Sequence, residues 1–155
     1  MKILKSIWLI CGLLMLSNSI IAQGLNNDVV KANMIVDWER AKLYTREYLD
    51  AMPEDGINFK PIPELRSFAE QMLHMSQGTI GLIASGTGAN PIYQGKVLEK
   101  ADEFKNKAAL TKVVMECYDY AIQSIKQMDA SKMDSLIKRG NYETDQFGWL
   151  NKAFE

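Results

Sequence analysis

Apolar side chains recur at intervals of three or four residues in three long stretches of the chain. The first stretch ends before Pro53, the second follows Ser67, and the third covers residues 110–128. This spacing places the apolar positions on one face of an α-helix. We therefore expect three long amphipathic helices whose apolar faces pack together. The expected core positions are Met34, Trp38, Ala41, Thr45, Tyr48, Met52, Phe68, Met72, Leu73, Met75, Ile80, Ile83, Leu110, Val114, Cys117, Ala121, Ile125 and Met128.

Residues with strong local preferences mark the ends of the first two helices. Pro53 ends the first helix, because the residue before a proline is pushed out of helical geometry. Ser67 and Glu70 match a capping box, in which each side chain satisfies a backbone N–H of the other residue. The second helix is therefore expected to begin at Ser67, or one turn earlier at Pro63, and to run to about Ala84.

Two connecting segments carry weaker signals. Gly86-Thr87-Gly88 follows no predicted strand and lacks the rest of a dinucleotide-binding motif, so we interpret it as a plain connector. Residues 96–107 predict a short helix or an ordered loop.

The segment after the third helix predicts a helical turn and then a break. The turn begins at Asp129 or Ser131 and is expected to include Met133 and Leu136, whereas Gly140-Asn141 interrupts regular structure. No stretch of useful length alternates apolar and polar residues, so the sequence predicts no strand.

A fourth helix is predicted from near Thr144, because Phe147, Leu150 and Phe154 have helical spacing. No Gly, Asn or Pro follows Phe154 to stop the helix, so we expect this helix to be incomplete. The expected fold class is all-α, a four-helix bundle with an incomplete last helix.

The N-terminal residues have the layout of a secretory signal peptide. Two lysines precede an apolar run over residues 7–16, and the small residue Ala22 precedes a more polar chain. The apolar run is shorter than the ~20 residues that cross a membrane, which makes an uncleaved anchor the weaker alternative. We expect residues 1–22 to be removed, and residues 23–155 to form one domain that is periplasmic or secreted.

The charge balance predicts no strong attraction to nucleic acid or to an anionic membrane. The whole chain has 18 basic and 19 acidic residues, and the signal peptide contains two of the basic ones and no acidic one. Cys117 is the only cysteine after cleavage, and its place in the apolar stripe predicts a core residue. Glu116 and Asp119 lie on the far side of the same helix and are interpreted as a solvated face.

Five motifs follow one another in the first half of the chain. In this order they resemble the DinB-like family, also described as DinB/YfiT-like metalloenzymes. The likeness is strongest over residues 38–74 and continues weakly through the third and fourth predicted helices. The motifs are Asp37-Trp38-Glu39-Arg40, Met52-Pro53-Glu54-Asp55, Phe59-Lys60-Pro61, the stretch 63–70 and Met72-Leu73-His74.

The resemblance implies a four-helix bundle with an unusual connection order and a divalent metal, zinc or nickel, held by three histidines. One histidine comes from the second helix, and the other two form a pair four residues apart on the fourth. Family activities include thiol-dependent transferases, isomerases and hydrolases that act on small molecules. His74 matches the second-helix ligand and is the only histidine in the chain. The other two ligands are expected beyond Glu155 or from a partner chain, for example in a homodimer.

The residues around His74 leave two interpretations open. On a helical wheel His74 shares its side with Glu70, Gln77, Gly78 and Gly81, so it is expected to be exposed or to line a groove. The glycines would leave room for a ligand or for a neighbouring helix. Glu70 is interpreted as a capping residue. The alternative is that it serves as a fourth metal ligand or as a general base.

Two classes of function therefore remain. The first is an exported metal-dependent transferase or hydrolase whose site is incomplete in this chain, so that the chain alone is expected to be inactive. The second is a non-catalytic helical bundle, used in binding or stress protection, in which His74 is a relic.

Overall fold

The computed structural model of the chain describes residues 26–155, so the predicted signal peptide, residues 1–22, lies outside the described part. The described residues are mostly helical, with one two-stranded hairpin and several short 3-10 turns. The helices and strands are α2 (Asn27–Ala51), α3 (Phe68–Thr87), α4 (Lys107–Gln127), β1 (Leu136–Arg139), β2 (Tyr142–Asp145) and α5 (Gln146–Phe154).

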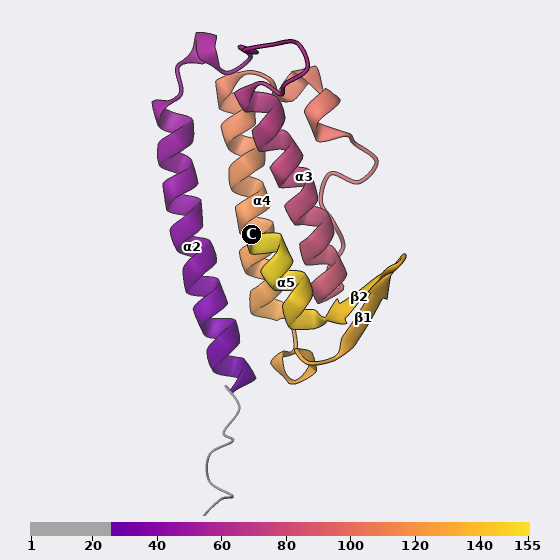
Figure 1. Cartoon of the computed structure of the whole chain (residues 1–155). Coiled ribbons are helices and arrows are strands. Elements are labelled where there is room, and N and C mark those ends of the chain that lie inside the picture. Colours follow the sequence, from indigo (N-terminus) through magenta and orange to yellow (C-terminus); the bar gives the residue numbers. More distant parts are fainter. Residues whose placement is uncertain (1–25) are drawn as a thin grey trace, which may run out of the picture.

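The long helices lie roughly along one direction, with α4 between α2 and α3 (Figure 1). The main packing contacts join α4 to both of its neighbours and join α5 to α3. The short helix α5 lies against the side of the bundle next to α3, and the hairpin projects outward on the side away from α2 (Figure 1). The all-α prediction is thus confirmed in its main part, although three helices are long and the fourth has nine residues.

The helix ends largely follow the predicted signals. Ser67 and Glu70 form both hydrogen bonds of the capping box, which settles the start of α3 at Phe68. The first predicted helix ends at Ala51, two residues before Pro53. α3 continues three residues beyond Ala84, because Gly88 adopts the left-handed conformation that ends a helix, with φ of 75°.

Two clusters of buried side chains fill the space between the helices. Leu73 and Cys117 belong to the first cluster, which confirms the prediction that Cys117 is a core residue. Trp38 and Leu150 belong to the second cluster, in which α2, α4 and α5 meet. Together the clusters hold α5 and the three long helices as one body.

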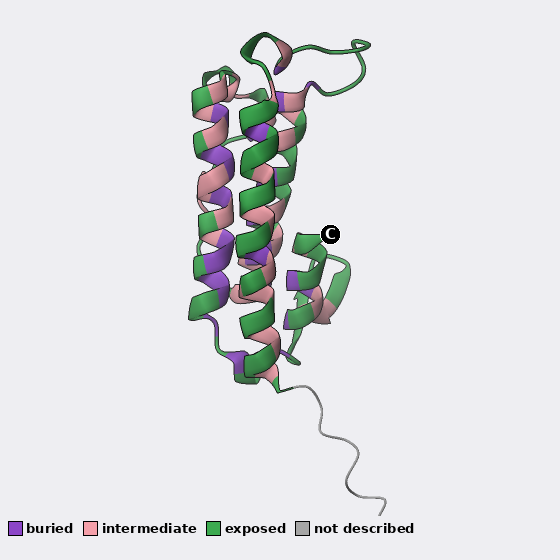
Figure 2. Ribbon diagram, turned by 90° about the vertical axis from the view of Figure 1, so that its left-hand side faces the viewer, coloured by how far each residue is buried: buried purple, intermediate pink, exposed green. Residues whose placement is uncertain are grey.

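Two predicted core residues, Tyr48 and Met75, face solvent, with 69% and 50% of their surface exposed. The reason lies in the packing of α2 and α3. The helix α2 packs mainly against one neighbour, α4, so only a narrow stripe of α2 is buried. The buried residues of α2 are Trp38 and Leu49. Figure 2 shows α2 at the front with its outward side exposed along its length.

The hairpin is the main correction to the sequence prediction. The expected helical turn is a 3-10 turn at Ala130–Lys132, and Leu136 begins a strand that pairs antiparallel with β2. Gly140, with φ of 60°, starts the two-residue turn, which suits the twist of a hairpin. Each strand has four residues, too few to show alternation. The indole N–H of Trp149 donates to the Ile137 carbonyl at 3.0 Å and ties the hairpin to α5.

The last helix begins at Gln146, two residues after the predicted start, because the Asp145 side chain accepts a hydrogen bond from Gly148 and caps it. Residues 96–107 are largely an ordered loop with 3-10 turns at Leu98–Lys100 and Asp102–Phe104. None of the described helices has the length and apolar character needed to cross a membrane.

Candidate functional site

His74 lies on the exposed side of α3, as its position on the helical wheel predicts, and 52% of its side chain is exposed. Its Nδ1 atom lies 2.8 Å from the Oε2 atom of Glu99. Glu99 belongs to the 3-10 turn Leu98–Lys100, which packs against α3. The structure therefore pairs the predicted metal ligand with a carboxylate that the sequence did not single out.

Glu99 is held in its ionised form by two neighbours. Its Oε2 atom also accepts a hydrogen bond from Arg66 Nε at 3.1 Å. Burial raises the pKa of Glu99, but the hydrogen bond and charge of Arg66, together with those of His74, outweigh burial and lower it. An ionised carboxylate only accepts hydrogen bonds, so Nδ1 of His74 carries the proton and Nε2 of a neutral ring keeps its lone pair.

Gln77 positions the turn that carries Glu99. It lies one turn after His74 on α3, and its amide makes two hydrogen bonds to the backbone of the loop. The side-chain oxygen accepts from the Leu98 N–H at 2.9 Å, and the nitrogen donates to the Lys96 carbonyl at 3.1 Å. Because the amide is bonded at both ends, the loop is fixed in register with the helix.

Glu70, one turn before His74, is committed to structure. One of its oxygens lies 2.7 Å from Lys60 Nζ and accepts the Ser67 N–H at 3.0 Å, and the other lies 3.7 Å from Lys105 Nζ. The hydrogen bond from Lys60 lowers the pKa of Glu70 most, followed by the bond from Ser67. The capping prediction is confirmed, and both carboxylate oxygens already have partners.

The donor set around His74 fits one metal ligand and not a complete site. Among residues 26–155, no three side chains of His, Cys, Asp or Glu form a group able to hold a metal ion. The face itself is open, because a Cβ atom built on Gly78 or Gly81 would meet nothing within 4 Å. A catalytic zinc site uses three protein ligands, and among residues 26–155 the face around His74 offers one.

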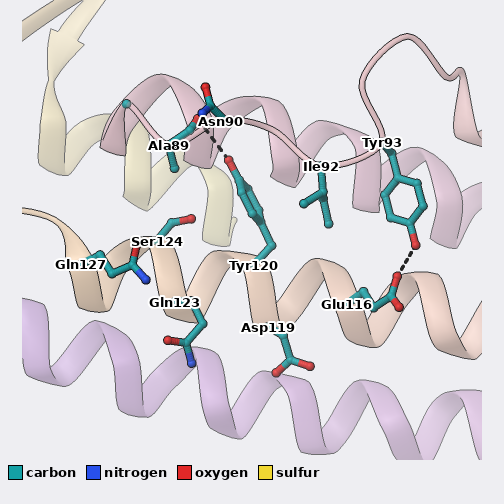
Figure 3. Close-up of a pocket in the computed structure, with 11 residues that line it drawn as sticks. Ala89, Asn90, Ile92, Tyr93, Glu116, Asp119, Tyr120, Gln123, Ser124 and Gln127 are labelled. Atoms are coloured by element: carbon teal, nitrogen blue, oxygen red, sulfur yellow. Dashed lines mark hydrogen bonds between the residues drawn. The ribbon is translucent and has the colours of Figure 1, made fainter.

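A hollow lies elsewhere in the molecule, between α4 and the loop that follows α3 (Figure 3). Its volume is about 800 Å³. Tyr93 reaches from the loop to Glu116, Tyr120 reaches from α4 to the Ala89 carbonyl, and Ile92 lies between the two rings (Figure 3). We call this hollow the tyrosine groove; its lining residues are Gly88, Ala89, Asn90, Ile92, Tyr93, Glu116, Asp119, Tyr120, Gln123, Ser124 and Gln127.

Tyr93 has an unusual backbone conformation. Its φ of 57° lies in the left-handed region, where it is the only non-glycine residue among those described. Such a conformation is strained for an aromatic residue and persists only where the surroundings hold it. The Tyr93 hydroxyl donates to Glu116, and its ring packs edge-on against Phe104 at 5.7 Å. Burial, followed by the bond to Glu116, raises the pKa of Tyr93 to about 12.

The sequence predicted a site on the face of His74 but did not predict the tyrosine groove. We interpreted Gly86-Thr87-Gly88 as a plain connector and Glu116 as part of a solvated face. The structure shows that the loop and this face of α4 lie against each other (Figure 3). The sequence does contain a signal for this groove, two adjacent rows of polar side chains at helical spacing. One row is Glu116, Tyr120 and Ser124, and the other is Asp119, Gln123 and Gln127.

No protein-family model matches this chain, and no curated protein matches it. The likeness to the DinB-like family therefore rests on the sequence motifs, chiefly those of residues 37–74.

Proposed function

We propose that this chain is an exported DinB-like protein in which His74 contributes one ligand to a divalent metal, zinc or nickel. In the proposed function the metal serves a transferase or hydrolase reaction on a small molecule. The observation that carries the proposal is the 2.8 Å contact between Nδ1 of His74 and Glu99 on an open face of α3. The order of motifs over residues 37–74 supports the family.

The pair of His74 and Glu99 has the chemistry of a supported metal ligand. Histidine ligands usually donate their second ring N–H to a carboxylate or carbonyl, which fixes the ring and makes the coordinating nitrogen more basic. Glu99 supplies this carboxylate, and Arg66 keeps it ionised. The Nε2 atom is then the coordinating atom. Because Gly78 and Gly81 have no side chains, the surface of α3 next to His74 has room for a ligand.

A bound metal would act as a Lewis acid or lower the pKa of a bound water or thiol. The further ligands have to come from outside residues 26–155 of one chain, and a second copy in a homodimer is one source. Within this chain, the role of Glu99 is to orient His74, and the role of Gln77 is to position the loop that carries Glu99.

A zinc titration followed by NMR tests the proposal, because the ring signals of the only histidine in the chain are unambiguous. We expect weak, saturable shifts of these signals in the full chain. Glu99→Gln should weaken the affinity about 10-fold or more, since loss of an orienting partner typically costs 10–100-fold. The matched control is Glu103→Gln, an exposed carboxylate of the same loop that pairs with Lys96.

Two outcomes would contradict the proposal. In the first, the ring signals do not respond to zinc or nickel. In the second, the affinity is the same in the parent and in Glu99→Gln. Either result would favour the alternative function, a non-catalytic helical bundle in which His74 has no ligand role.

A further inference from the structure

We propose that the tyrosine groove is a binding site for a neutral, polyhydroxylated ligand such as a short oligosaccharide. The groove is separate from the proposed metal ligand, since neither His74 nor Glu99 lines it. Its floor is the polar face of α4, and its wall is the loop of residues 88–93. The ligand class follows from the charge, the polarity and the shape of this lining.

The lining offers no positive charge to bind an anionic ligand. No Lys or Arg is among the lining residues, and the nearby lysines Lys42 and Lys112 already face Asp119 and Glu116. A cation is not required either, because Lys42 of α2 pairs with Asp119 and the Tyr93 hydroxyl bonds to Glu116. Both carboxylates keep free lone pairs, and these accept hydrogen bonds from uncharged donors.

Most of the exposed lining surface is apolar, but the polar side chains among it argue against a purely apolar ligand. Gln123, Gln127 and Ser124 present amide and hydroxyl groups along α4, and an apolar ligand would cover these groups without bonding to them. An amide offers both donors and acceptors, as does each hydroxyl of a sugar. A ligand rich in hydroxyl groups therefore satisfies the lining where a hydrocarbon leaves it unpaired.

Two tyrosines add the apolar surface that such a ligand also needs. Tyr120 crosses the groove from α4, and Tyr93 crosses it in the opposite direction (Figure 3). A sugar ring has C–H groups that pack on an aromatic face, while its hydroxyls bond to the polar rim. Polar groups around an apolar surface are the usual composition of a small-molecule site.

The groove has the length for more than one ring and is held in shape before any ligand binds. Glu116, Tyr120 and Ser124 are four residues apart, so they rise about 12 Å along α4. The loop is fixed at Tyr93 by Glu116 and at Ala89 by Tyr120, whose hydroxyl donates at 3.5 Å. A preformed wall reduces the entropy lost on binding, which is consistent with the strained backbone at Tyr93.

Ligand-observed NMR with the full chain tests this proposal. The probes are maltotriose, cellotriose and tri-N-acetylchitotriose, together with an acetylated and amidated tripeptide as the uncharged non-sugar probe. We expect saturable binding of at least one trisaccharide. The double variant Gln123→Ala/Gln127→Ala should weaken that binding about tenfold, because it removes two sets of hydrogen bonds.

Gln71→Ala is the matched control, since Gln71 is an exposed glutamine on α3 outside the groove. This variant should bind the trisaccharide with the same affinity as the parent. Thermal unfolding of the variants checks that exposed substitutions leave the fold intact. The proposal is overturned if no trisaccharide binds, if only the tripeptide binds, or if the double variant binds as the parent does.

Discussion

Two regions of α3 both contain glycine, yet their surroundings are opposite. A Cβ atom built on Gly86 would lie 3.0 Å from the Cβ atom of Trp149 in α5. A Cβ atom built on Gly78 or Gly81 would meet nothing within 4 Å. The end of α3 that carries Gly86 is therefore closed by packing, whereas the face that carries His74 is open.

The difference separates a structural region from one that is available for binding. At the closed end, α5 approaches α3 closely, and the buried amide of Gln146 donates to the Gly86 carbonyl at 2.7 Å. On the open face, polar contacts from His74 and Gln77 hold a loop, and the neighbouring positions Gly78 and Gly81 are uncovered. Substitutions in the two regions should therefore change different quantities.

Gly86→Ala should cause the largest change in stability. The added methyl group would press on Trp149 and Leu150, so α5 has to move away from α3. Overpacking of this kind costs about 1–3 kcal/mol, which exceeds the gain in helix propensity from alanine. We expect urea unfolding to show a lower free energy of unfolding by roughly 1–2 kcal/mol. An unchanged or higher free energy would show that α5 does not pack on Gly86 in solution.

Glu99→Gln should have a smaller, pH-dependent effect from the open face. The pKa of Glu99 is lowered from 4.5 in the folded chain, so ionised Glu99 stabilises the fold above pH 4.5. This stabilisation is lost as the pH falls through the folded-state pKa. At neutral pH we expect the variant to be less stable by about 1 kcal/mol, the scale of a partly exposed ion pair.

Urea unfolding of the parent and Glu99→Gln, at neutral pH and well below pH 4.5, measures this effect. The difference between the two proteins should shrink at the lower pH. Glu143→Gln, on the exposed hairpin, is the control for general charge effects. A difference that stays constant with pH would mean that the contact of Glu99 with Arg66 and His74 is not maintained in solution.

Local signals in the sequence predicted most of the helical structure. Pro53 and the capping box at Ser67 act within one helical turn, so the sequence near them determines the helix ends. Cys117 lies within an apolar stripe and is buried, as predicted. The hairpin was missed because its strands are four residues long, and Trp149, which anchors it, lies outside the pattern of the strands.

The sites depend on contacts between distant residues, which the sequence does not display. His74 could be singled out alone, but its partner Glu99 is 25 residues away in a loop without a clear pattern. The tyrosine groove likewise needs the loop after α3 to fold back on α4. Exposure of Tyr48 and Met75 was missed because helical periodicity marks an apolar side without telling whether a neighbouring element covers it.

Gly81→Ala tests the open side of the comparison and should have the smallest effect, with the opposite sign to Gly86→Ala. The new methyl group enters open space, so only the backbone preference changes. Alanine in a helix is favoured over glycine by roughly 0.5–1 kcal/mol, and the free energy of unfolding should rise by that amount in urea unfolding. A decrease would mean that another molecule, such as a second copy of the chain, covers this face in solution. Repeating the measurement over a range of protein concentrations distinguishes the two cases, because stabilisation of a single chain does not depend on concentration.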